Sequence, residues 1–300
     1  MTATDNAASN VHPRLPDEPV VRRSAMSGMQ HVAQEWPARA FFGVLLASIT
    51  IAATIAGGFY FAGLLAVIAL AASREWYRMV SGDRYALETF FTTAAIGAGL
   101  VAVVATRTAI WPAAMLTVGA ALAAGASLRR GAPALWNGGG ALYIGVPALC
   151  LAALRVDAPH GSWVVVGLFV TVWAADTGAL VWGRFLGGPK LVPALSPNKT
   201  WSGIAGGVIL PAASLSLYVM YLGGNGWRAG VLGAVLATAG HVGDLFESWV
   251  KRRVGRKNSG SLIPGHGGVL DRVDSTLFVA PLAAALIFVF GLDPLFGAHP

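Results

Sequence analysis

The residues of this chain that could do chemistry gather in one stretch near its C-terminus. Five basic residues between Lys251 and Lys257 precede the loop 264–268, and Asp271 and Asp274 follow it. Charged residues make up only 12% of the chain, so this concentration points to a site. Cations and backbone N–H groups bind phosphate oxygens, and carboxylates bind Mg²⁺. The stretch therefore predicts a site for a metal-bound phosphate substrate.

The loop 264–268 reads Pro-Gly-His-Gly-Gly and directly precedes an apolar run. Glycines let backbone N–H groups approach an anion, and the N-terminus of a following helix adds about half a positive charge. A helix would place Asp271 and Asp274, at i and i+3, on one face, where they could hold Mg²⁺ together with Asp244. The alternative is a flexible loop followed by ordinary acidic residues of a first helical turn.

The apolar run before this stretch carries polar side chains at helical spacing. Asp244, Ser248 and Lys251 fall at i, i+4 and i+7, so a helix places them on one face. The alternative is a capped helix end with a surface salt bridge. A carboxylate, a hydroxyl and a cation in register inside an apolar bundle favour a functional site.

Two further features lie upstream. Asp176 falls inside an apolar run, where a carboxylate costs roughly 2.5–3.5 kcal/mol on insertion scales. It is either functional or a hydrogen-bond partner between helices. The loop that follows contains glycines and prolines that preclude a simple helix. Its residues Ser196, Lys199 and Thr200 offer a cation and hydroxyls to phosphate, although a plain basic loop would explain the charge alone.

Apolar segments must position these residues. Hydrophobic residues make up 55% of the 300 positions, and the mean hydropathy is +0.63. Repeated apolar runs of span length predict an all-α, polytopic integral membrane protein. We expect about nine transmembrane helices, at 41–56, 58–73, 88–105, 109–127, 136–154, 163–183, 202–222, 227–249 and 275–292.

The distribution of basic residues predicts the orientation. With nine spans and a cytoplasmic N-terminus, 18 of the 21 Lys and Arg residues lie on the cytoplasmic side. The outer side keeps only Arg107, Arg155 and Arg228, as the positive-inside rule predicts. Both unusual loops, 184–201 and 250–274, then share the cytoplasmic face.

Composition also excludes several classes of function and suggests three regions. The single Cys150 excludes a disulfide framework and a cysteine-rich metal site. The pI near 10 reflects cytoplasmic loops beside anionic lipid, and no basic stripe interleaved with aromatic residues indicates nucleic-acid binding. We expect a disordered cytoplasmic tail at 1–38, N-terminal transmembrane helices at 39–160, and a catalytic transmembrane region at 161–300.

At its polar motifs the chain resembles the CDP-diacylglycerol synthases, also called phosphatidate cytidylyltransferases. That family's signature runs Ser-x-x-Lys-Arg, four residues, Lys-Asp, then Pro-Gly-His-Gly-Gly-x-x-Asp-Arg-x-Asp. It matches Ser248, Lys251, Arg252, Lys257, Pro264, Gly265, His266, Gly267, Gly268, Asp271, Arg272 and Asp274. Further matches are Asp176, Ser196, Pro197, Lys199, Thr200, Gly243, Asp244 and the segment Glu75-Trp76-Tyr77-Arg78. The resemblance covers most of residues 40–292.

The resemblance implies transfer of the cytidylyl group from CTP to phosphatidate, giving CDP-diacylglycerol and pyrophosphate for phospholipid biosynthesis. It implies Mg²⁺ at Asp244, Asp271 and Asp274, and a second cation such as K⁺. The implied catalytic residues are these three acids and Lys251. The implied substrate and phosphate contacts are Asp176, Ser196, Lys199, Thr200, Ser248, Arg252, Lys257, His266, Gly267, Gly268 and Arg272.

Two departures from the family pattern leave alternatives open. Asn258 stands where the family usually has Asp, and Ser202 where it commonly has Glu. Three alternative functions remain: a non-catalytic homologue, a CTP-dependent kinase of polyprenol or phytol, and a secondary transporter. No internal repeat supports the transporter. For the main reading we expect a bacterial inner-membrane enzyme that contacts membrane lipids, with a cytoplasmic active site and a homodimeric assembly.

Overall fold

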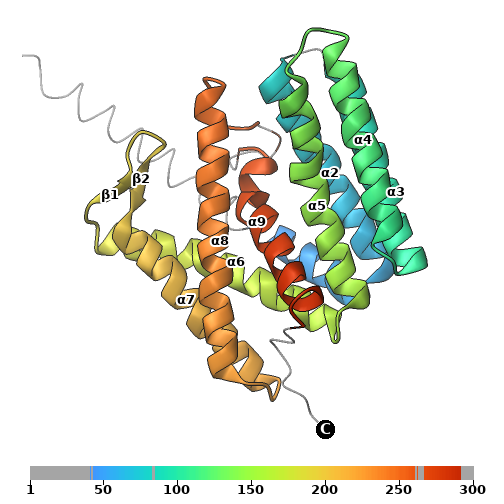
Figure 1. The fold of residues 1–300 in the computed structure, drawn as a ribbon. Coiled ribbons are helices and arrows are strands. Elements are labelled where there is room, and N and C mark those ends of the chain that lie inside the picture. Colours follow the sequence, from blue (N-terminus) through green and yellow to red (C-terminus); the bar gives the residue numbers. More distant parts are fainter. Residues whose placement is uncertain (1–40, 42, 83–84, 261, 263–266, 292–300) are drawn as a thin grey trace, which may run out of the picture. The chain divides into compact units, whose positions relative to one another are not determined.

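The computed structural model describes residues 41, 43–82, 85–260, 262 and 267–291. The chain divides at Leu45, and every element labelled in Figure 1 lies in the part from Leu46 onward. The predicted tail 1–38 and the candidate residue His266 lie outside the described residues.

The fold is all-α except for one short hairpin. The helices are α2 (Gly58–Ser81), α3 (Ala86–Thr106), α4 (Ile110–Leu128), α5 (Ala134–Asp157), α6 (Gly161–Phe185), α7 (Trp201–Tyr221), α8 (Gly226–Arg253) and α9 (Leu270–Phe288). The antiparallel strands β1 (Lys190–Val192) and β2 (Ser196–Thr200) pair with Lys190 opposite Thr200. The loop that the sequence marks as non-helical is therefore this hairpin.

Seven helices, α2 to α8, are long and apolar enough to cross a membrane, which makes the chain a polytopic integral membrane protein. The other two predicted spans coincide with the shorter apolar helix Gly43–Ala56 and with α9. α9 has three charged residues in its first two turns, which sets it apart from the seven. The count of nine and the cytoplasmic N-terminus stay predictions.

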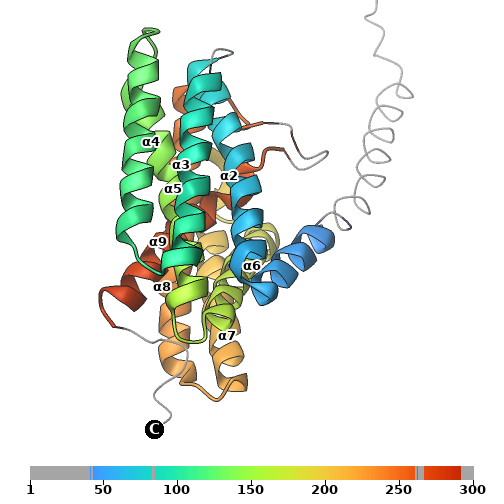
Figure 2. The same cartoon turned by 90° about the vertical axis from the view of Figure 1, so that its right-hand side faces the viewer.

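The helices form two groups that meet at α9. Helices α2 to α5 pack side by side, and Figure 2 shows them running roughly along one direction. Helix α7 packs between α6 and α8, and α6 crosses behind α8 in Figure 1. Helix α9 packs against both α8 and α5, so its position fixes how the two groups face each other.

Helix α2 extends beyond the expected end of the second span at residue 73 and continues to Ser81. Polar and aromatic residues there suggest a chain leaving the membrane, but Glu75, Trp76 and Tyr77 are all buried. The Trp76 indole N–H donates to the carbonyl of Trp136 at 3.1 Å. Tertiary partners of this kind sustain a helix beyond its apolar segment.

A buried polar cluster closes the same end of the α2–α5 group. The Tyr77 hydroxyl donates to the carbonyl of Asn137 at 3.0 Å, and the Ser127 hydroxyl donates to Glu88 at 2.8 Å. Arg130 forms an ion pair with Glu88, whose side chain is fully buried. A buried carboxylate is tolerated only when it is paired in this way.

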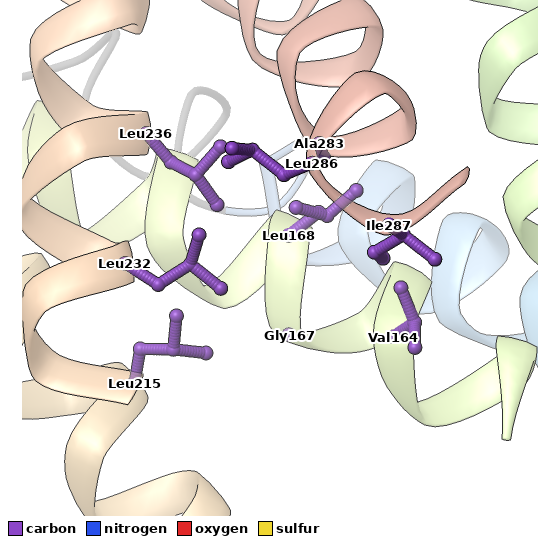
Figure 3. Close-up of a pocket in the computed structure, with 9 residues that line it drawn as sticks. All are labelled: Val164, Gly167, Leu168, Leu215, Leu232, Leu236, Ala283, Leu286 and Ile287. Carbon is purple, nitrogen blue, oxygen red and sulfur yellow. The ribbon is translucent and has the colours of Figure 1, made fainter. Parts of the chain in front are cut away.

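An apolar pocket lies between α6, α7, α8 and α9 (Figure 3). It is lined by Val164, Gly167, Leu168, Leu215, Leu232, Leu236, Ala283, Leu286 and Ile287. Leu168 and Leu236 each precede an aspartate of the same helix, Asp176 and Asp244, by eight residues, which is about 12 Å along the helix axis. The pocket is therefore separate from the charged groups, and its lining carries no group for chemistry.

The Glu88–Arg130 pair gives a first prediction. Arg130→Met should lower the free energy of unfolding by about 2 kcal/mol, because Glu88 would stay buried without its cation. Its exposed neighbour Arg129 is the matched control, and Arg129→Met should change stability by less than about 0.5 kcal/mol. Equilibrium unfolding in mixed detergent micelles measures the free energy of unfolding of both variants. Equal stability of the two would contradict a structural role for the pair.

Candidate active site

The hairpin delivers a lysine to an aspartate of α8. Lys199 on β2 lies with its Nζ 2.5 Å from Oδ2 of Asp244. The sequence predicts both residues as site members but gives no sign that they pair. Strand β2 ends where α7 begins, so the first turn of α7 fixes the position of this lysine.

Three aspartates from three helices share this region. Asp244 of α8 interacts electrostatically with Asp176 of α6 and with Asp274 of α9. Lys199 and the exposed Arg272 also act on Asp176 and offset part of the negative charge. Three of the predicted acids are therefore brought together, although they lie on separate helices and span almost 100 residues of sequence.

A second group of charges consists of Glu247 and Lys251 on α8 and Asp271 on α9. The Lys251 Nζ is 2.8 Å from Oδ1 of Asp271 and 3.5 Å from Oε1 of Glu247. Glu247 is fully buried, and neither of its carboxylate oxygens has a hydrogen-bond partner among the described residues. Glu247 also interacts with Asp274, which links the two groups of charges.

Glu247 is not among the site residues predicted from the sequence, although its spacing gives a signal. It lies at i+3 from Asp244 and at i−4 from Lys251, on the helix face that the spacing of Asp244, Ser248 and Lys251 already defines. A glutamate four residues before a lysine pairs with it on a helix, so the position was open to prediction.

The first turn of α9 is held by carboxylates of the protein itself. The Gly268 N–H donates to Oδ2 of Asp271 at 3.0 Å, and the Ser259 N–H donates to the same atom at 3.3 Å. The N–H groups of Val269 and Leu270 donate to the two carboxylate oxygens of Glu75 on α2. Phosphate contacts by Gly267 and Gly268 stay a prediction, and the neighbouring N–H groups already have anionic acceptors.

The remaining predicted phosphate ligands are spread around the acids. Thr200 is buried and caps α7, since its hydroxyl accepts the N–H of Gly203 at 3.1 Å. Arg252 donates its Nε–H to the carbonyl of Leu195 at 3.3 Å, which ties the end of α8 to the hairpin. Ser196 and Ser248 are half-buried, and Lys257 is exposed beyond the end of α8.

The donor set suits a divalent cation that also binds substrate. Among the described residues, no group of three His, Cys, Asp or Glu side chains forms a ready cage for a metal ion. Mg²⁺ usually takes only one or two protein carboxylates, together with water and substrate phosphates. The crowded carboxylates, and the Glu247 oxygens that accept no hydrogen bond among the described residues, fit a cation chemically. The assignment of Mg²⁺ to Asp244, Asp271 and Asp274 stays a prediction.

The chain is similar to proteins of a known family over most of its length. Residues 37–290 match the model of the cytidylyltransferase family. The phosphatidate cytidylyltransferase of Brucella suis biovar 1 (strain 1330) is 39% identical over 254 residues, which cover 84% of this chain and 92% of that protein. That of Staphylococcus haemolyticus (strain JCSC1435) is 41% identical over 147 residues, covering 48% of this chain and 55% of that protein. That of Rickettsia bellii (strain RML369-C) is 37% identical over 161 residues, covering 51% and 68%.

The position of Lys251 between two acids predicts a coupled effect on stability. Lys251→Met should lower the free energy of unfolding by about 3 kcal/mol, because Glu247 and Asp271 would lose their shared cation. Adding Glu247→Gln should recover part of that loss, since a buried charge disappears with its partner. Arg253→Met on the same turn is the control. Its guanidinium lies over the Trp249 ring at 5.5 Å, and losing that contact should cost about 0.5–1 kcal/mol. Additive effects of the two site substitutions would contradict the coupling.

Asp271 predicts a pH-dependent contribution to stability. It lies outside the seven candidate spans, in the first turn of α9. Burial raises the pKa of Asp271, but the hydrogen bond and charge of Lys251 and the Gly268 N–H together hold it below its ordinary value. Such a carboxylate stabilises the fold above its unfolded pKa of about 3.9, and the stabilisation is lost as the pH falls through the lower folded pKa.

Asp271→Asn should therefore be less stable than the wild-type protein at neutral pH, and the difference should shrink below about pH 4. Unfolding in detergent at a series of pH values measures this difference. A difference that stays constant through the acid range would show that the Asp271 charge contributes nothing.

Proposed function

We propose that this chain, which belongs to the cytidylyltransferase family, transfers the cytidylyl group of CTP to phosphatidate and releases pyrophosphate. The single observation that carries the proposal is the 39% identity to a phosphatidate cytidylyltransferase along 84% of the chain. The arrangement of charges supports it, because both proposed reactants carry phosphate groups and the site pairs acids with lysines.

The proposed reaction forms one phosphorus–oxygen bond and breaks another. An oxygen of the lipid phosphate attacks the α-phosphorus of CTP, and pyrophosphate leaves with the electrons of the broken bond. The lipid phosphate is already ionised near neutral pH, so the attack needs no strong general base. The site has to align two anions and neutralise their charge.

The ion pairs of two lysines support this proposal. Lys199 and Lys251 each pair with an aspartate, so each can donate to a phosphate oxygen from a position already fixed by its partner. Arg252 and Lys257 are exposed at the end of α8, where the triphosphate of CTP could first be attracted. Mg²⁺ bound at Asp244 and Asp271 would neutralise phosphate charge.

The membrane architecture also suits these substrates. We propose that the protein lies in the bacterial cytoplasmic membrane with the site at the cytoplasmic face, which follows from the bias of Lys and Arg. The acyl chains of phosphatidate can then stay in the bilayer while CTP arrives from water. A homodimer is a further proposal, and mass photometry in detergent would test it.

The experiment combines purified protein in detergent with CTP, phosphatidate and Mg²⁺, and follows CDP-diacylglycerol and pyrophosphate together. We expect equal amounts of the two products. Asp244→Asn and Asp271→Asn should each lower kcat by a factor of about 100 or more, because each removes a carboxylate from the charged centre. Asp157→Asn is the control, since Asp157 is exposed at the end of α5.

The products separate the competing functions. Formation of CDP and a phosphorylated lipid alcohol, without pyrophosphate, would instead establish γ-phosphoryl transfer by a CTP-dependent kinase. Binding of CTP by a folded protein that releases neither product would contradict the proposal and identify a non-catalytic member of the family.

A further inference from the structure

We infer that Glu75 is a positioning residue for the active site, and that it acts by holding the first turn of α9 and, through Ser259, the Asp271 carboxylate. The inference rests on the proposed function, because it assigns Asp271 to the reacting centre. It goes beyond that function, because Glu75 lies on α2, in the other group of helices, and is not one of the proposed metal or phosphate ligands.

Glu75 is a buried carboxylate whose acceptors are occupied by three donors. Its Oε1 accepts the N–H of Val269 at 3.0 Å. Its Oε2 accepts the N–H of Leu270 at 2.9 Å and the hydroxyl of Ser259 at 3.3 Å. Two of these donors are N–H groups at the start of α9, which have no partner inside the helix. Glu75 therefore fixes where α9 begins.

The charge of Glu75 adds to these contacts. The N-terminus of an α-helix carries a partial positive charge, which favours an anion close to its first N–H groups. Glu75 is that anion for α9, and it comes from a residue about 195 positions away in sequence. Neutralising the side chain should weaken the contact more than loss of a neutral hydrogen bond would.

Ser259 connects Glu75 to Asp271. Its hydroxyl donates to Glu75, while its own N–H donates to both oxygens of Asp271 at 3.3 and 3.4 Å. Ser259 is buried between the two carboxylates. A displacement of Glu75 would therefore release Ser259 as well as α9, and both hold Asp271 in its orientation beside Lys251.

The neighbouring glycines make room for this carboxylate. A Cβ at Gly268 would overlap the Ser259 hydroxyl and lie 2.5 Å from Oε2 of Glu75. A Cβ at Gly260 would overlap Oε1 of Glu75. These two glycines permit the approach of a carboxylate of the protein itself, so Glu75 accounts for part of the glycine-rich pattern around α9.

The test compares Glu75→Ala, Glu75→Gln and the wild-type protein in detergent, by steady-state kinetics and by hydrogen exchange of the segment 268–274. We expect Glu75→Ala to lower kcat by a factor of about 20, with the KM for CTP changed by less than about threefold. Exchange of the 268–274 amides should become about tenfold faster, while α3 and α4 keep their protection. Glu75→Gln should be intermediate, because it keeps an acceptor and loses the charge.

Chemical rescue separates a missing anion from general damage. Glu75→Ala removes the carboxylate and leaves space that formate can enter. Formate should restore kcat by a factor of about 5 and restore protection of the 268–274 amides, whereas sodium chloride at the same ionic strength should do neither. Arg74→Ala, which changes an exposed residue next to Glu75, should behave as the wild-type protein in both measurements.

Three outcomes would overturn the inference. These are an unchanged kcat in Glu75→Ala, faster exchange throughout α3 and α4 as well, and equal rescue by formate and chloride. Absence of CDP-diacylglycerol synthesis by the wild-type protein would instead contradict the proposed function. In that case the exchange and its rescue by formate still decide whether Glu75 holds α9.

Discussion

Compensation of buried carboxylates is the constraint on which this structure depends. An ionised carboxylate in an apolar interior costs several kcal/mol unless a cation or several N–H groups face it. Three buried or half-buried acids take their cation from another element: Glu88 from the segment after α4, Asp244 from the hairpin, and Asp271 from α8. The acids therefore connect these elements, in addition to the apolar packing and the polar contacts such as that of Tyr77 with Asn137.

The pairing of carboxylates with lysines also matters for the chemistry that the site can perform. Lys199 and Lys251 balance the aspartates in the protein alone, and both can turn to phosphate oxygens when phosphorylated substrates arrive. Glu247 differs, because it is fully buried and accepts no hydrogen bond among the described residues, with Lys251 3.5 Å from its Oε1. A buried acid with so little compensation is typical of functional sites.

Helical periodicity made much of the site predictable from the sequence. The spacing of Asp244, Ser248 and Lys251 predicts their shared face, and the apolar runs predict seven spans that the structure describes. The pairing of Lys199 with Asp244 was not predictable, because it depends on a hairpin whose register and direction are set by tertiary packing. Glu75 was missed as a site residue for the same reason: its donors lie almost 200 residues downstream.

The two departures from the family pattern, Ser202 and Asn258, can be judged by whether they pair with the acids of the site. Ser202 lies at the base of the hairpin, where its hydroxyl donates to the carbonyl of Gly187 and bonds with that of Thr200 at 3.0 Å. Asn258 is exposed beyond α8. Neither residue supplies or removes a partner of the paired acids Asp244 and Asp271. The ion pairs of Asp244 and Asp271 thus involve neither residue, and a glutamate at 202 would add one more carboxylate beside the cap of α7.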